Sequence, residues 1–137
     1  MVEDKKMALQ VISFTDAQED YGTYLMGALP LGDVSLDKLL AEMDNEIEKL
    51  QNELISEREF KKLQNQFENN FVNSNSSIEG IANSLARYNM LYDDTSLINK
   101  EIEIYRSITR EDIQNVAKKY LNKNQRLNLD YLPESSK

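Results

Sequence analysis

The chain has 137 residues with no histidine, cysteine or tryptophan, and its 24 acidic and 16 basic side chains give a formal charge of −8 at pH 7. These absences exclude a Ser-His-Asp triad, an imidazole base, a thiolate nucleophile, an iron–sulfur cluster and zinc sites built from histidine or cysteine. The acidic excess argues against nucleic acid and against an anionic membrane surface as partners. We therefore expect one domain of ordinary size that is not a self-contained enzyme.

Two β-rich runs open the chain. Residues 8–14, ALQVISF, predict a first strand, and the polar residues 15–20 predict the connection that follows it. Residues 21–29 predict a second strand, which Pro30 ends. No apolar stretch reaches the roughly 18 residues that a membrane-spanning helix requires.

Long amphipathic helices are expected next, because the chain contains only 4 glycines and 2 prolines. Ser35 is the predicted N-cap of the first helix, whose apolar side chains recur at three- and four-residue steps as far as Leu54. Ser56 and Glu59 have the spacing of a capping box, which predicts the start of the second helix.

Three further helices are predicted after a break. Residues 73–76 are all asparagine or serine, and Ser76 with Glu79 has the spacing of another capping box before the third helix. A fourth helix is expected over residues 95–107, and Thr109 is the predicted N-cap of the fifth.

The chain ends in a segment with strand-like alternation. In residues 126–132, apolar side chains at 127, 129 and 131 alternate with polar ones, as in a half-buried strand. The order of elements predicts an α+β fold, a small antiparallel sheet of about three strands with four to five helices packed on one face. So few strands also predict an incomplete sheet, whose unpaired edges would invite another chain or segment.

Two groups of carboxylates are the main candidates for metal or acid–base chemistry. They lie on the outward faces of the predicted helices, so we expect solvated surfaces and neither metal ligands nor catalytic groups there. The groups are Glu42, Asp44, Glu46, Glu48 and Glu53, and Glu101, Glu103, Glu111 and Asp112.

Three motifs follow one another in an order that can be compared with known families. They are ExxKL closing the first helix, SxxEFxKxxNQ opening the second, and ITREDIQNVAKKYL leading into RLNLDYLP. Together they resemble the C-terminal domain of one half of an M16 (pitrilysin or insulinase-like) zinc metallopeptidase. The resemblance spans nearly the whole chain.

The resemblance implies a non-catalytic role. In M16 peptidases two halves enclose a chamber, and an HxxEH helix in the first domain of one half holds the zinc; that motif is absent here. The resemblance thus implies that residues 1–137 are a single, N-terminally truncated domain that contributes chamber wall and contacts between halves. No cofactor is expected in this chain, and zinc is expected only in the catalytic domain of the parent protein.

The N-terminal residues resemble a substrate-contact segment of the same family. In that segment an arginine and a tyrosine contact the substrate, and the corresponding positions here are Glu3 and Leu9. Glutamate reverses the charge that would hold a peptide carbonyl or an oxyanion, so we expect no direct substrate polarisation from this segment. This chain then belongs either to the half that carries zinc or to a degenerate, inactive half.

Two functions from different classes follow. The first is an inactive domain of a protein that hydrolyses peptide bonds in peptides or small proteins, with the remaining domains or the partner half as its partners. The second is a stand-alone helical interaction module that pairs through an exposed sheet edge, for example as a homodimer. The sequence leaves the bacterial periplasm or cell envelope and the cytoplasm open as locations.

Overall fold

The computed structural model describes residues 1–3, 5–18 and 20–132, and the chain divides into two compact units. Unit 1 consists of Met1–Asn52 and the chain from Ala117 onward, and unit 2 is Glu53–Val116. Unit 1 is therefore built from two separate stretches of sequence. None of the helices in the described parts is both long enough and apolar enough to cross a bilayer.

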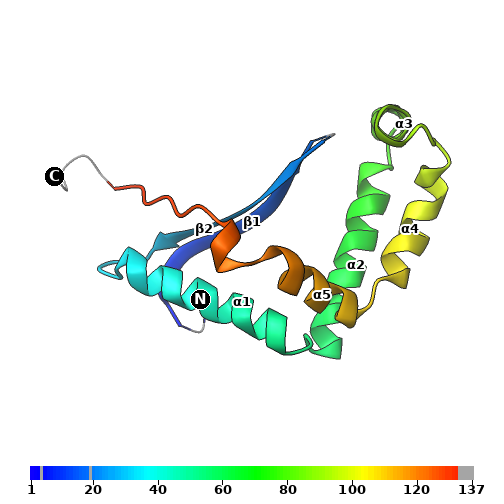
Figure 1. Cartoon of the computed structure of the whole chain (residues 1–137). Coiled ribbons are helices and arrows are strands. Elements are labelled where there is room, and N and C mark those ends of the chain that lie inside the picture. Colours follow the sequence, from blue (N-terminus) through cyan, green and yellow to red (C-terminus); the bar gives the residue numbers. More distant parts are fainter. Residues whose placement is uncertain (4, 19, 133–137) are drawn as a thin grey trace. The chain divides into compact units, whose positions relative to one another are not determined.

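The sheet of unit 1 is a long antiparallel hairpin of β1 (Ala8–Ala17) and β2 (Gly22–Pro30), drawn in blue in Figure 1. Phe14 lies opposite Leu25, and the ladder continues to Ala17 opposite Gly22. The first strand is therefore longer than predicted, and the expected connection at residues 15–20 starts as strand. Pairing with β2 satisfies the backbone of its polar residues, which local sequence patterns do not register.

Helix α1 (Leu36–Asn52) packs on β2 and contributes Leu39 to the small core of unit 1. The predicted N-cap is confirmed, because the backbone N–H of Lys38 donates to Ser35 Oγ at 3.3 Å. Within the described residues the buried apolar side chains are Ala8, Leu39 and Ala117, each at most 3% exposed. All three belong to unit 1, and further apolar side chains of α1, such as Leu40 and Ile47, are half-buried and contribute in proportion to the area they bury.

Unit 2 starts with α2 (Glu57–Ser74), and its predicted capping box is confirmed. The Glu59 N–H donates to Ser56 Oγ at 3.2 Å, and the Ser56 N–H donates to Glu59 Oε2 at 3.3 Å. This box forms between residues three apart, which is why the sequence alone predicts it.

The N-cap of α3 (Ile78–Tyr92) is Ser77, and the prediction of Ser76 with Glu79 is wrong by one residue. Ser77 has an extended backbone, φ −123° and ψ 157°, and its Oγ accepts the Gly80 N–H at 3.0 Å. The Ser76 hydroxyl instead donates to the Asn73 carbonyl at 2.7 Å, which closes the end of α2. Two adjacent serines thus serve two helix ends.

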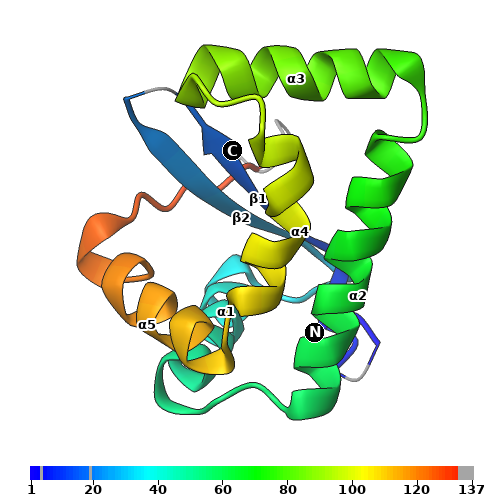
Figure 2. The ribbon, with the colours of Figure 1, turned by 90° about the vertical axis from the view of Figure 1, so that its right-hand side faces the viewer.

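Helices α2 and α4 (Leu97–Ser107) run side by side in unit 2, and α3 crosses near their ends (Figure 2). The rings of Phe67 and Tyr105 stack with centroids 5.3 Å apart. The next residue along each helix forms an ion pair, in which Arg106 donates to both carboxylate oxygens of Glu68 at 2.7 and 2.9 Å. An aromatic stack and a bidentate ion pair therefore join α2 and α4.

Helix α5 (Arg110–Tyr120) has Thr109 at its N-cap, as predicted. The Asp112 N–H donates to Thr109 Oγ1 at 3.1 Å, and the Thr109 N–H donates back to Asp112 Oδ2 at 2.9 Å. A short 3-10 turn, η1 (Lys123–Gln125), follows α5.

The predicted third strand at residues 126–132 is not paired in the described part of the chain, so the sheet has two strands and not about three. Leu127, Leu129 and Tyr131 are 90, 83 and 93% exposed. The alternation correctly indicates extended backbone, but a strand also needs a neighbour that sequence periodicity does not supply. The α+β class itself is confirmed.

The corner between α2 and α3 leads to a first prediction, for Gly80→Ala. A Cβ at this position would overlap the carbonyl oxygen of Ser74, which belongs to the backbone and cannot swing away. We expect the substitution to lower the free energy of unfolding by about 1–3 kcal/mol, as overpacking typically does. Urea unfolding followed by helical circular dichroism measures this.

Asn83→Ala is the matched control, because it adds alanine to an exposed position of the same helix. It should be neutral or slightly stabilising. Equal stability of the Gly80→Ala protein and the wild type would contradict the close approach at this corner.

Candidate functional site

Glu3 and Leu9, which the family resemblance aligns with a substrate-contact pair, both lie in the N-terminal stretch of unit 1. Glu3 is exposed in a turn before β1, and Leu9 is on β1 with 57% of its surface exposed. In residues 1–3, 5–18 and 20–132 the structure records no contact between their side chains. The expectation that this segment does not polarise a substrate carbonyl stays a prediction.

The most organised polar cluster lies on α1, where the C-terminal stretch of unit 1 returns to the helix. We call it the C-terminal anchor: Asp44 and Glu48 of α1 with Lys123 and Arg126. Arg126 binds both oxygens of Asp44, with Nη2 3.1 Å from Oδ2. Lys123 Nζ lies 2.8 Å from Glu48 Oε1 and 3.6 Å from Asp44 Oδ2.

The electrostatics of the C-terminal anchor favour ion pairing and not proton transfer. The hydrogen bond from Arg126 holds the pKa of the Asp44 carboxyl below its ordinary value near 3.8. The hydrogen bond to Glu48 raises the pKa of Lys123. Both groups thus stay charged near neutral pH, whereas a general base or acid needs a pKa close to the working pH.

A hollow of about 360 Å³ adjoins the anchor, and hydrogen bonds to the end of α5 form part of its wall. Gln51 Nε2 donates to the carbonyls of Ala117 and Leu121 at 3.2 and 2.9 Å, and Asn122 Nδ2 donates to the carbonyl of Lys119 at 3.0 Å. The Lys119 carbonyl is one that the helix leaves unpaired at its C-terminus, whereas the Ala117 carbonyl also accepts the Leu121 N–H at 3.0 Å. The hollow therefore lies where the C-terminal stretch of unit 1 is hydrogen-bonded to α1.

The N-terminal residues are fastened to the same helix. Lys5 pairs with Glu42 and lies 3.3 Å from Glu46 Oε1, while Lys49 lies 3.0 Å from that oxygen. Lys49 and then Lys5 lower the pKa of Glu46. Glu42 and Asp44 have side chains only 14 and 15% exposed, so the expectation of a fully solvated acidic face on this helix is wrong.

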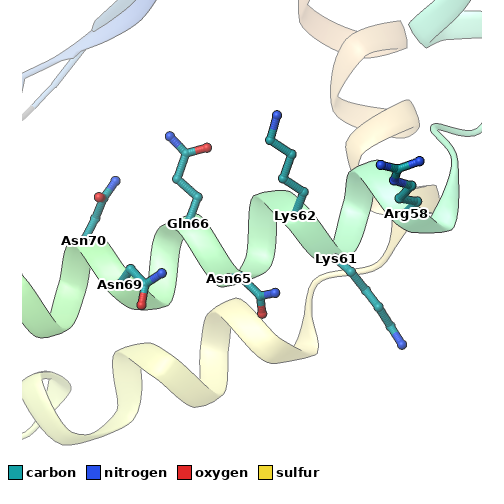
Figure 3. A pocket seen from close by; sticks show the side chains of 7 residues that line it. All are labelled: Arg58, Lys61, Lys62, Asn65, Gln66, Asn69 and Asn70. Carbon is teal, nitrogen blue, oxygen red and sulfur yellow. The ribbon is translucent and has the colours of Figure 1, made fainter.

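The polar face of α2 carries a second hollow, of about 840 Å³, which is shown in Figure 3. Its wall has only cations and side-chain amides: Arg58, Lys61, Lys62, Asn65, Gln66, Asn69 and Asn70. Lys62, Gln66 and Asn70 point to the same side of the helix at four-residue steps (Figure 3). The wall has no carboxylate, hydroxyl or thiol, and its cations and amides can donate hydrogen bonds to a ligand.

Zinc does not fit the donor set of this chain. The sequence has neither histidine nor cysteine, and the described residues bring no three carboxylates together at one point. Zinc in proteins is held mainly by histidine and cysteine, with carboxylates as additional ligands. The residues of this chain therefore support no zinc-dependent reaction step.

The C-terminal anchor leads to a second prediction, for Asp44→Asn. Because the pKa of Asp44 is lowered by folding, its contribution is fully present above its ordinary pKa and is lost as the pH falls through its folded value. We expect Asp44→Asn to cost about 1 kcal/mol at pH 7, and the cost to shrink steadily as the pH falls below the ordinary carboxyl pKa. Urea unfolding at a series of pH values gives this difference.

Glu53→Gln is the control, since Glu53 is exposed and has no ion pair within the part of the chain that the structure describes. Its effect should be small and nearly independent of pH. A cost for Asp44→Asn that does not shrink at all as the pH is lowered, until the protein unfolds in acid, would show that the carboxylate charge is not what fastens Arg126.

Comparisons with known proteins place this fold among proteases. No family model and no curated protein matches the chain. A protease from Helicobacter pylori is 22% identical with a TM-score of 0.80, over 90% of this chain and 30% of its own. The inactive peptidase domain of a protein assigned as a zinc protease in Bordetella parapertussis is 23% identical with a TM-score of 0.80, over 93% of this chain and 68% of its own.

The periplasmic protease PqqL from Escherichia coli is 21% identical with a TM-score of 0.68, over 87% of this chain and 13% of its own. The chain thus spans about 30% of the length of the Helicobacter protease. At identities below 25%, these likenesses establish the fold, which this chain shares with part of each of the three protease chains.

Proposed function

We propose that this chain is a non-catalytic part of a zinc-protease-like protein of the M16 type. One observation carries the proposal: 93% of the chain superposes on 68% of an inactive peptidase domain with a TM-score of 0.80. The motif order from ExxKL to RLNLDYLP supports it independently, because it resembles the same family.

The chemistry of the chain fits a structural role. Its organised polar clusters are ion pairs that fasten its own segments, and this pairing lowers the pKa of Asp44 and raises the pKa of Lys123. The positions that correspond to the substrate-contact pair hold Glu3 and Leu9, which cannot donate a hydrogen bond from the side chain to a carbonyl near pH 7. In this proposal catalysis and zinc belong to another domain.

The surfaces of the chain suit packing against further protein. Unit 2 has no buried side chain among its apolar residues, and both faces of the hairpin carry exposed apolar side chains. Such surfaces are typical of segments that are covered in a larger assembly. We therefore assign this chain to the wall and the inter-half contacts of a peptidase whose other domains complete it.

A third prediction tests the absence of catalysis. The purified chain should bind far less than one zinc per molecule after incubation with the metal, because it lacks the ligands that zinc prefers. It should also leave quenched fluorescent peptides intact with or without chelator. Stoichiometric zinc in elemental analysis, or hydrolysis that a chelator abolishes, would overturn this part of the proposal.

The membership in a larger peptidase has its own test. The polypeptide encoded next to this chain in the genome is co-expressed with it, and the pair is examined by size-exclusion chromatography with light scattering. The proposal expects a protease-like neighbour, with or without an HxxEH helix, that forms a stable complex with this chain. A neighbour that is unrelated to proteases and does not bind would count against it.

A further inference from the structure

The polar face of α2 carries its cations and side-chain amides in two rows that run along the helix. The first row is residues 58, 62, 66 and 70, and the second is residues 61, 65 and 69, so each row advances by four residues at a time. Lys62, Gln66 and Asn70 of the first row point to one side of the helix (Figure 3). We call the two rows, which together line the hollow of about 840 Å³, the donor stripe.

Two features of the donor stripe do not favour the helix that carries it. Its three cations, Arg58, Lys61 and Lys62, lie near the N-terminus, the end at which the helix macrodipole disfavours positive charge, and the last turn of α2 has no basic residue. Its three asparagines are poor helix formers at exposed positions. Residues that break local preferences without a gain in folding are typical of functional surfaces.

The side chains of the donor stripe are free to bind a partner. Within residues 1–3, 5–18 and 20–132 none of them takes part in a hydrogen bond or an ion pair, whereas Arg126, for example, is bound to Asp44. Two carboxylates flank Arg58 in the sequence, but Glu59 is engaged in the capping box and Glu57 lies outside the wall of the hollow. The stripe therefore presents positive charge and amides that the described chain does not use.

The spacing of the rows matches that of an extended peptide. Residues four apart on a helix are about 6 Å apart along its axis. In an extended chain every second residue turns its N–H and C=O to the same side, and such residues repeat about every 6.6–6.8 Å. A peptide between the two rows can therefore present alternate backbone groups to each row, and side-chain amides can both donate to its C=O and accept from its N–H.

We propose that the donor stripe binds an extended acidic peptide segment of another polypeptide. The carboxylates of the segment lie beside the cations, and its backbone runs along the amides. The stripe covers 12 residue steps from Arg58 to Asn70, about 18 Å, which is the length of five or six extended residues. The proposal stands on α2 alone and does not depend on membership in a peptidase.

Other anionic partners fit the donor stripe less well. It has no aromatic side chain on which a nucleic-acid base could stack, and the formal charge of −8 on the chain repels a long polyanion. It has no apolar side chain to enter a membrane, and its three cations are fewer than a polybasic lipid-binding segment has. A single small anion would leave most of the length of the stripe unused.

A fourth prediction concerns Lys62→Glu and a fluorescein-labelled hexaglutamate peptide. Fluorescence polarisation at about 20 mM salt should show saturable binding of the peptide to the wild-type chain, with a Kd on the order of 0.1 mM. Lys62→Glu reverses a charge beside the peptide carboxylates, so it should raise the Kd about tenfold or more. Urea unfolding of this variant should show no loss of stability, because glutamate near a helix N-terminus is favourable.

Lys38→Glu is the matched control, because it makes the same charge change at an exposed position of α1. It should change the Kd less than about threefold. Absence of saturable binding to the wild type, or equal weakening in both variants, would overturn the proposal. Tighter binding of an oligothymidylate or of phosphatidylserine vesicles than of hexaglutamate would overturn the assignment to a peptide.

The amides are tested separately from the charge by the double substitution Asn65→Ala and Asn69→Ala. Loss of two hydrogen-bonding groups should raise the Kd for hexaglutamate about fivefold or more. The double substitution Asn83→Ala and Asn99→Ala, at exposed positions of α3 and α4, should leave it within about twofold of the wild type. A Kd that depends on Lys62 but not on the two amides would indicate a patch that attracts any anion, and would overturn the extended peptide as its ligand.

Discussion

The acidic side of α1 holds both ends of unit 1, and the rest of that unit depends on it. Lys5 reaches Glu42 and Glu46 from the N-terminal side, and Arg126 reaches Asp44 from the C-terminal side. With only Ala8, Leu39 and Ala117 buried in the described chain, apolar burial cannot supply this fastening. Charge-assisted hydrogen bonds take its place, so the unit should be more sensitive to salt and acid than a domain with a full core.

The sequence predicted what is decided between near neighbours and missed what is decided at long range. The capping boxes at Ser56 and Thr109 involve residues three apart, and both are present. The partners of the α1 carboxylates lie 37 to 82 residues away, and nothing in the local pattern of Asp44 indicates Arg126. Residues 126–132 alternate apolar and polar side chains but pair with no strand in the described chain. Alternation determines which side chains share one face of a sheet, and it does not determine which strand lies beside them.

The candidate site also shows this difference between local features, which the sequence predicts, and long-range contacts, which it does not. The lack of histidine and cysteine argues against catalysis by those residue types, and the polar clusters consist of paired charges. What the sequence could not predict is that these charges join distant stretches of chain. Each of the three protease chains that share this fold extends beyond the part that matches it.

The hydrogen bonds from Gln51 to the carbonyls of Ala117 and Leu121 span 66 and 70 residues, because all of unit 2 lies between the two stretches of unit 1. During synthesis the hairpin and α1 leave the ribosome first, yet they cannot acquire their last partners until unit 2 has followed. Unit 2 is continuous and can form as soon as it emerges. Unit 1 therefore cannot be completed until its C-terminal stretch has been synthesised. Its completion closes a loop that contains all of unit 2.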